Sequence, residues 1–185
     1  MMKAFIFLAL LLTSAFSRLH DDDLVTADQI DLEAIVKIGI YYNIVSKPDP
    51  IDLECHCSQV IYTWITKGTD LNLSESCRFF SAQGKNVTSN SEAVPIDATN
   101  SRLINYNFHR LAKAPYDFVQ VADDYSWLAV GMPNRKYFWL LSSKPTLDQS
   151  IVDAVLKNQT LVNNYDFTKY SVEDQSCHNT TVISY

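Results

Sequence analysis

The chain has 185 residues, of which 47% are hydrophobic and 19% charged, with a formal net charge of −6. This length and composition suit one domain with a packed core, and the acidic balance argues against nucleic acid as a partner. Near the start, Lys3 is followed by a short apolar run and a small-residue step that ends at Ser17. We therefore expect a signal peptide over 1–17, removed before Arg18, and one secreted, extracellular domain over 18–185 without a transmembrane segment.

Short β-branched and aromatic runs separated by turn signals follow from Gly39 onward. A turn of helix is expected just before them, because Leu32, Ile35 and Val36 have helical spacing. A proline-rich segment ends the first run, and Lys67-Gly68 forms a hairpin turn after the second. The runs predict eight strands, over 40–45, 57–65, 71–80, 86–91, 102–108, 116–122, 125–130 and 136–141.

One amphipathic helix follows the last of these strands. Thr146 is predicted to cap it, because Gln149 stands at the capping-box spacing and an apolar stripe follows. A short strand at 168–172 comes next. Eight consecutive short strands with tight turns favour an all-β, up-and-down antiparallel barrel with the helix packed outside, and a Greek-key sandwich is the alternative. The strands 125–130 and 136–141 favour the barrel, because both are apolar on two faces, as strands between a core and a helix are.

Four cysteines stand in the expected mature chain, namely Cys55, Cys57, Cys77 and Cys177. In an exported protein they should form two disulfides, for which three pairings exist. A metal site is the alternative, because His56 and His178 adjoin cysteines. The paired C-x₂-C spacing of zinc sites is absent, however, so we predict no metal and no cofactor.

Four N-x-S/T sequons occur, at Asn72, Asn86, Asn158 and Asn179. Together with a signal peptide they indicate a glycoprotein. Each asparagine that carries a glycan must face solvent, so the sequons predict surface positions.

The longest recognisable stretch runs from Asp123 to Leu147 and reads DDYSWLAVGMPNRKYFWLLSSKPTL. It resembles the stretch D-D-Y-x-W-A-L-V-G-x-P-x-R-K-Y-L-W-I-L-S-R-x-P-x-L of lipocalins of the apolipoprotein D and bacterial lipocalin group. Gly39–Val45 resembles their G-x-W-Y-E-I-A motif, and Cys57–Tyr62 resembles their C-x-Q-x-x-Y motif. The resemblance covers about 39–177 and implies an eight-stranded barrel that holds a small hydrophobic ligand.

Two residues depart from the family pattern, because the family tryptophan is Tyr41 here and the family arginine is Ser143. In lipocalins these two residues meet at the closed end of the barrel, with the guanidinium lying across the indole. Since both partners change together, no buried charge is left unpaired. The resemblance therefore predicts that Tyr41 and Ser143 lie near one another at the closed end.

The same resemblance implies a Cys57–Cys177 disulfide, which leaves Cys55 and Cys77 on neighbouring strands of a hairpin. The swapped pairing, Cys55–Cys177 with Cys57–Cys77, is the alternative. A free thiol at Cys77 would favour a thiol-dependent isomerase, an activity that some lipocalins have. No H-E-x-x-H spacing and no G-x-S-x-G elbow occur, and we predict that the protein is not an enzyme.

Ligand contacts are also implied by the resemblance. Tyr62 and Trp139 match positions at which apolipoprotein D places aromatic residues against its ligand. Alternate residues of a strand face the same side, so Trp64 shares the face of Tyr62, and Tyr137 shares that of Trp139. The predicted ligand-binding residues are Tyr62, Trp64, Phe118, Trp127, Tyr137 and Trp139. For each of them the alternative is ordinary core packing.

The function that these observations predict is a secreted carrier of a small lipophilic ligand, such as a lipid, sterol or retinoid, held in the barrel cavity. The alternative is a secreted barrel filled by its own side chains, which acts through transient contacts with a receptor protein or a membrane surface. The sequence assigns neither the ligand nor the oligomeric state.

Overall fold

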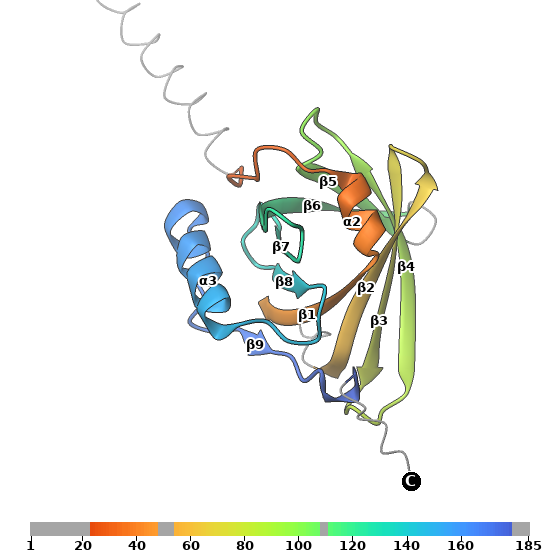
Figure 1. The fold of residues 1–185 in the computed structure, drawn as a ribbon, viewed down its shortest axis with the longest axis vertical. Coiled ribbons are helices and arrows are strands. Elements are labelled where there is room, and N and C mark those ends of the chain that lie inside the picture. Colours follow the sequence, from red (N-terminus) through yellow and green to blue (C-terminus); the bar gives the residue numbers. More distant parts are fainter. Residues whose placement is uncertain (1–22, 48–53, 108–110, 179–185) are drawn as a thin grey trace, which may run out of the picture.

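A computed structural model describes residues 23–47, 54–107 and 111–178 (Figure 1). The expected signal peptide and its cleavage point lie outside the described residues. None of the helices within the described ranges is long and apolar enough to span a membrane.

The strands form one antiparallel sheet that closes on itself. They follow one another in the order β2-β3-β4-β5-β6-β7-β8-β1, and β1 also pairs with β2, which completes the barrel. A short outer strand, β9, pairs with β1. The up-and-down barrel is thus confirmed, and the Greek-key alternative is wrong. The bounds are β1 (Ile40–Lys47), β2 (Cys55–Thr66), β3 (Asp70–Phe79), β4 (Asn86–Pro95), β5 (Arg102–Asn107), β6 (Ala112–Val121), β7 (Trp127–Gly131), β8 (Phe138–Ser142) and β9 (Ser171–Val172).

Four strands, β1, β2, β4 and β6, are longer than predicted, and the last two contain a proline. β4 extends to Pro95, which pairs with Leu103, and β6 begins before Pro115, which pairs with Ile104. Proline lacks the N–H group that a ladder uses, so strands often end beside it. Here the neighbouring residues on both strands keep the ladder in register.

The helix α2 (Leu32–Ile38) precedes the first strand, as predicted, and lies beside β2 (Figure 1). The Asp31 carboxylate caps it by accepting hydrogen bonds from the backbone N–H groups of Glu33 and Ala34. Gly39 ends it with φ +80, a backbone conformation that suits glycine. Strand β1 therefore begins directly after this short helix.

The helix α3 (Gln149–Asn163) stands outside the barrel (Figure 1). Its cap is Asp148, which accepts a hydrogen bond from the Ser150 backbone N–H at 2.8 Å, so the prediction of Thr146 as the cap is wrong. Asp148 itself has extended backbone angles, and Leu147 before it packs against the layer under the helix. A carboxylate at the cap satisfies the first N–H groups, and the helix starts later than the capping-box spacing suggests.

The core has two layers, one inside the barrel and one between the barrel and α3. Strand β7 shows how both form, because Leu128 and Val130 pack inside while Ala129 packs against the helix layer. The helix contributes Val152 and Val155 to that outer layer. Strands β7 and β8 are therefore apolar on both faces, as predicted.

Candidate functional site

One end of the barrel is covered by the segment that precedes β1. The Ile30 N–H donates to the Thr99 carbonyl (2.8 Å) between β4 and β5, and the Asp31 N–H donates to the Tyr125 hydroxyl (2.7 Å) between β6 and β7. Ile35 of α2 is fully buried beneath this segment. We call this the closed end, and we call the opposite end, where β3 turns into β4, the mouth.

Tyr41 and Ser143 lie at the closed end. Strand β1 pairs with β8 so that Tyr42 is opposite Ser142, which places Tyr41 and Ser143 at the adjoining positions. The Tyr41 hydroxyl donates to the backbone carbonyl of Tyr125 at 2.9 Å. The predicted proximity of Tyr41 and Ser143 is confirmed, and with it the register of the last barrel strands.

The half of the interior next to the closed end is filled by the protein's own side chains. Tyr62 and Phe118, both predicted as ligand contacts, have no exposed surface there. The other fully buried side chains of this inner cluster include Tyr41, Leu71, Leu73, Leu103, Leu128 and Val130. Burial of each large apolar side chain stabilises the fold by about 1.5–3 kcal/mol. This half is therefore structural core.

On β3 and β4, the inward-facing positions become exposed toward the mouth. On β3, Leu73 is fully buried, whereas Glu75, two residues on and on the same face, is exposed. On β4, Ser91 is buried, whereas Ser89 and Val87 are exposed. Because alternate residues of a strand face the same side and Leu73 pairs with Ser91, exposure changes at one level on these two strands. The inward faces of β3 and β4 are therefore exposed on the mouth side of this level, and we call this part of the interior the open half.

Polar side chains lie at this level. The hydroxyls of Tyr62 and Tyr116 hydrogen-bond to each other across the interior, from β2 to β6. Ser91 Oγ and Asn105 Oδ1 are buried without a hydrogen-bond partner among the described residues. Burial raises the pKa of both tyrosines, and the charge of Glu75 raises it further, so both hydroxyls stay protonated at neutral pH. A molecule entering from the mouth would meet these polar groups.

Tyr137 and Trp139 are the two predicted residues nearest the mouth. Trp139 pairs with Ser46 close to the end of β1, and it packs against the inner cluster. Its ring is stacked on that of Tyr137, with centroids 6.1 Å apart and planes 8° apart. Both side chains are half-buried. They form an aromatic wall beside the open half of the interior.

Trp64 and Trp127 lie elsewhere. The Trp64 indole N–H donates to Glu33 Oε2 of α2 at 3.1 Å, and its ring lines an outer groove of about 450 Å³ at the closed end, with Asn100 and Tyr125. Trp127 packs against the layer under α3, because its neighbour Leu128 is the residue that faces inward. Trp127 therefore does not face the barrel interior, and neither tryptophan is part of the open half.

Four polar residues of the interior were not predicted as site residues: Glu75, Ser91, Asn105 and Tyr116. The sequence signal that could have identified them is a polar residue two positions from an apolar one in the same strand. Ser91 before Ala93 and Asn105 after Leu103 are examples. Such a residue shares a face with the core. The signal identifies them only once the inward face of each strand is known.

The four cysteines form two disulfides, Cys55–Cys77 and Cys57–Cys177. This is the pairing implied by the lipocalin resemblance, and the swapped alternative is wrong. His178 lies within 4.8 Å of the sulfurs of Cys57 and Cys177, but these sulfurs are bonded to each other and are not thiolates. Metal binding through them would require reduction of the disulfide.

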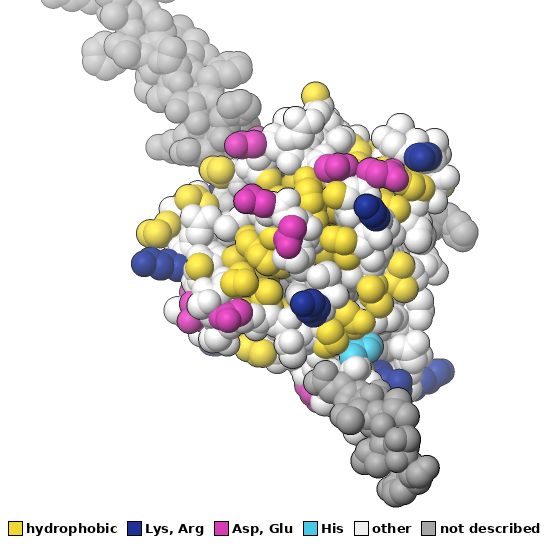
Figure 2. Space-filling view, viewed as in Figure 1, with side chains coloured by type: hydrophobic (Ala, Val, Ile, Leu, Met, Phe, Trp, Pro, Cys, Tyr) yellow, Lys and Arg dark blue, Asp and Glu magenta, His cyan; other side chains and the backbone are white. Residues whose placement is uncertain are grey.

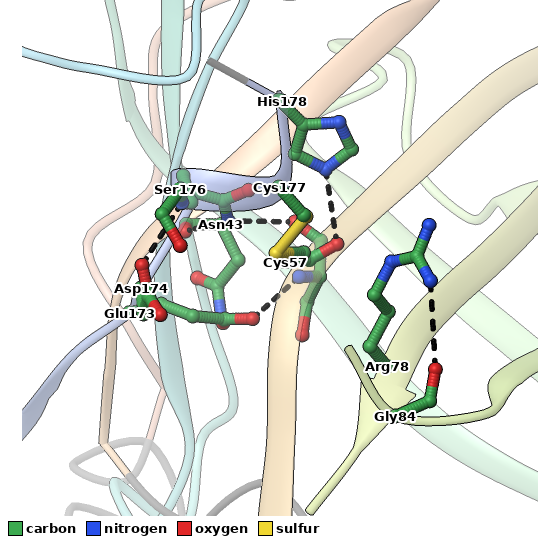
Figure 3. The surroundings of a disulfide bond; sticks show 11 residues. Asn43, Cys57, Arg78, Gly84, Glu173, Asp174, Ser176, Cys177 and His178 are labelled. Carbon is green, nitrogen blue, oxygen red and sulfur yellow. Dashed lines mark hydrogen bonds between the residues drawn. A yellow bond between two sulfur atoms is a disulfide. The ribbon is translucent and has the colours of Figure 1, made fainter. Parts of the chain in front are cut away.

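The Cys57–Cys177 disulfide belongs to a segment that fills a gap in the barrel wall (Figure 3). Strands β1 and β2 pair only from Ile40 to Tyr42 and then separate. The Glu173 carboxylate bridges them by accepting hydrogen bonds from Asn43 Nδ2 on β1 and from the Ser58 N–H on β2.

We call this junction of residues 173–177 with β1 and β2 the seam, and two further residues, Gln175 and Asp174, contribute to it. Gln175 Nε2 donates to the carbonyls of Asn43 (2.7 Å) and Ser58 (3.0 Å), again one on each strand. The Cys57 N–H donates to the Asp174 carbonyl at 2.9 Å. Residues 173–177 thus supply the backbone groups of the separated strands with partners that a neighbouring strand would otherwise provide.

The sequons lie in different surroundings. Asn86 is exposed at the start of β4. Asn72 is half-buried and donates to Thr63 Oγ1 at 3.3 Å, and Asn158 is half-buried on α3 and donates to Gln120 Oε1 at 3.0 Å. Asn179 lies outside the described residues. Use of these sites remains a prediction.

Comparison with known proteins supports the fold. A family model described as a lipocalin-like domain matches residues 30–175. Lobster apocrustacyanin A1 is 15% identical over 77% of this chain and 78% of its own, with a TM-score of 0.59. Insecticyanin from the tobacco hornworm Manduca sexta is 18% identical over 82% and 84%, with a TM-score of 0.58. The cockroach allergen Per a 4 is 17% identical over 84% and 96%, with a TM-score of 0.59. A comparison with curated proteins finds no match.

Proposed function

The chain belongs to the lipocalin-like family, and we propose that it is a secreted protein that carries a small hydrophobic ligand in the mouth half of its barrel. The observation that carries the proposal is the change of exposure along the inward faces, from fully buried Leu73 to exposed Glu75 on β3. Proteins of this family generally bind small hydrophobic ligands. The narrower likeness to the apolipoprotein D group remains a prediction.

The energetics of such a site are adequate for carriage. A ligand that buries about 300 Å² of apolar surface gains up to about 7 kcal/mol at roughly 25 cal/mol per Å², before the cost of ordering it. That free energy corresponds to binding in the micromolar range. Tyr137 and Trp139, stacked beside the open half, would supply rigid apolar surface for it.

Quenching of tryptophan fluorescence tests the proposal. Fatty alcohols, fatty acids, retinoids and sterols would be titrated into the folded protein, and at least one class should quench it saturably. Trp139→Phe should remove most of this quenching, whereas the matched control Trp127→Phe should keep it, because Trp127 lies outside the barrel. Absence of saturable quenching by every class, or its loss only in Trp127→Phe, would contradict the proposal.

Secretion is a second part of the proposal. Two disulfides, which suit an oxidising compartment, support it. The amino-terminal sequence of protein collected from the medium of expressing cells should begin at Arg18. Retention of the intact amino terminus inside the cells would contradict this part alone.

A second candidate function is contact with a receptor or a membrane surface, without a ligand. Two observations favour it, the filled closed half of the barrel and the hydrophobic side chains gathered at the centre of the face shown in Figure 2. This alternative predicts a normally folded protein with no quenching in the titration above. A thiol-dependent isomerase lacks its nucleophile, because Cys77 is bonded to Cys55 and no cysteine of the described residues, which include all four, is free.

A further inference from the structure

Four buried polar atoms lack a hydrogen-bond partner among the described residues. Asn43 Oδ1 and Gln175 Oε1 lie where the carboxy-terminal segment joins β1 and β2, whereas Ser91 Oγ on β4 and Asn105 Oδ1 on β5 lie inside the barrel away from it. Ser91 and Asn105 are 7% and 9% exposed. Both face inward, because Ala93 and Leu103, two positions away on the same strands, belong to the inner cluster. A buried polar group without a partner costs about 1–3 kcal/mol. A polar group of another molecule would therefore be stabilised beside them.

The tyrosine pair lies close to these atoms along the sheet. Tyr62 pairs with Leu73, which in turn pairs with Ser91, and Asn105 pairs with Ala114, two residues before Tyr116. Each hydroxyl has one proton, so a hydrogen bond between the two uses one proton and leaves the other to be donated elsewhere. The interior at this level thus offers both acceptors and a donor.

An acidic side chain stands at an inward-facing position of the open half. Glu75 faces inward on the mouth side, and its charge acts on both Tyr62 and Tyr116, since it raises the pKa of each. Among the described residues at inward-facing positions of the eight barrel strands, none is lysine or arginine. A carboxylate buried here would have the Glu75 carboxylate nearby and no lysine or arginine at these strand positions to offset its lost hydration, which is costly.

We propose that the preferred ligand is a neutral lipophilic alcohol, which enters with its hydroxyl group first and donates a hydrogen bond to Asn105 Oδ1. This inference rests on the proposed carrier function. The alcohol hydroxyl also accepts a hydrogen bond from the Ser91 hydroxyl, while its hydrocarbon part lies toward Trp139. A fatty acid of the same length, ionised at neutral pH, binds more weakly at this site.

Matched ligands test the choice between alcohol and acid. Dodecan-1-ol and dodecanoate, and retinol and retinoate, would be titrated at pH 7.5, with affinity taken from calorimetry. Each alcohol should bind about tenfold more tightly than its acid, as expected for one satisfied buried acceptor and no buried charge. Equal or tighter binding of the acids would overturn the inference and leave the carrier function standing. No binding of any ligand would overturn both.

Three variants test which residues cause the preference for alcohols over acids. Asn105→Leu should weaken the alcohols about tenfold and leave the acids unchanged, because it removes the acceptor but keeps a similar volume. Glu75→Gln should strengthen the acids and leave the alcohols unchanged. Ser91→Ala is a smaller change that also removes a polar atom, and it should weaken the alcohols even if Asn105→Leu fails to fold. Equal losses for alcohols and acids in either polar-to-apolar variant would contradict the assignment.

Discussion

Tyr41 shows how one residue can replace a pair of residues. In the family pattern an arginine lies across a tryptophan at the closed end, and its guanidinium binds backbone carbonyls. Here the Tyr41 hydroxyl itself donates to the Tyr125 carbonyl, and the ring packs edge-on against Tyr62 with centroids 5.6 Å apart. Ser143 occupies the arginine position, where its backbone N–H donates to the Ser126 carbonyl at 2.9 Å. The closed end therefore needs no buried cation.

Replacing Tyr41 with phenylalanine tests this contact. Tyr41→Phe keeps the ring and removes the hydrogen bond to Tyr125, so the free energy of unfolding in urea should fall by about 1–2 kcal/mol. Tyr170→Phe is the control, because Tyr170 is 40% exposed. A variant as stable as the wild type would mean that the hydroxyl contributes nothing at this end.

Asp117 is a buried carboxyl whose ionisation should make stability depend on pH. It is 3% exposed, and burial raises its pKa from 3.8 to about 6, although nearby Arg102 opposes the shift. Between about pH 4 and pH 6 the folded protein keeps a proton on Asp117 that the unfolded chain has lost. The contribution of Asp117 to stability is therefore fully present below pH 4 and is lost as the pH rises through 6.

The corresponding variant is Asp117→Asn, which cannot ionise. At pH 7.5 its free energy of unfolding should exceed that of the wild type by about 1–3 kcal/mol, since two pKa units correspond to about 3 kcal/mol. Thermal and urea unfolding from pH 4 to pH 8 would measure this gain, with exposed Asp28→Asn as a control for the substitution. A gain that is the same at pH 4 and pH 7.5 would exclude ionisation as its cause.

At the scale of elements, the carboxy-terminal segment acts as part of the barrel wall. Strands β1 and β2 separate beyond Tyr42, and Glu173 and Gln175 hydrogen-bond to both of them. The Cys57–Cys177 disulfide fixes this segment to β2 across 120 residues of sequence, whereas Cys55–Cys77 joins two adjacent strands across 22. The two disulfides should therefore differ in what they contribute.

Removing each disulfide separately measures that difference. The double variant Cys57→Ser/Cys177→Ser should lose about 1.5 kcal/mol more stability than Cys55→Ser/Cys77→Ser, because the longer loop restricts the unfolded chain more. The same double variant also detaches the seam from its covalent link to β2, which should lower the free energy of unfolding further. Urea unfolding of the two double variants, each with the other disulfide confirmed intact, is the measurement. A larger loss for the Cys55–Cys77 pair would contradict a sealing role for the segment.

For the whole molecule, the arrangement of layers decides which surfaces remain free. Asn86 is exposed on β4, whereas the Asn158 amide is half-buried between α3 and the barrel and bonds to Gln120. If the protein passes through the secretory pathway, glycopeptide mapping should find a glycan at Asn86 and none at Asn158. Full occupancy of Asn158 would mean that α3 packs differently on the barrel.

The sequence by itself determined the strand runs and the outer helix, favoured the barrel over a Greek-key sandwich, and implied the closed-end pair through a long family motif, because all of these are local features. Trp127 could not be oriented in this way. Strand β7 is apolar on both faces, so alternation alone does not say whether Trp127 or Leu128 faces inward. The cap of α3 was misplaced by two residues, since Thr146 and Asp148 both suit a cap.

Only the tertiary structure decided where the interior is filled and where it is open. The alternation of residues along its strand predicts that Tyr62 faces inward. Whether it binds a ligand or packs in the core depends on the residues that face it from strands far away in sequence. The same holds for Ser91 and Asn105, whose unpartnered atoms are defined by what surrounds them. Burial and hydrogen-bond satisfaction are properties of the assembled barrel, because they depend on distances between strands that no local pattern fixes.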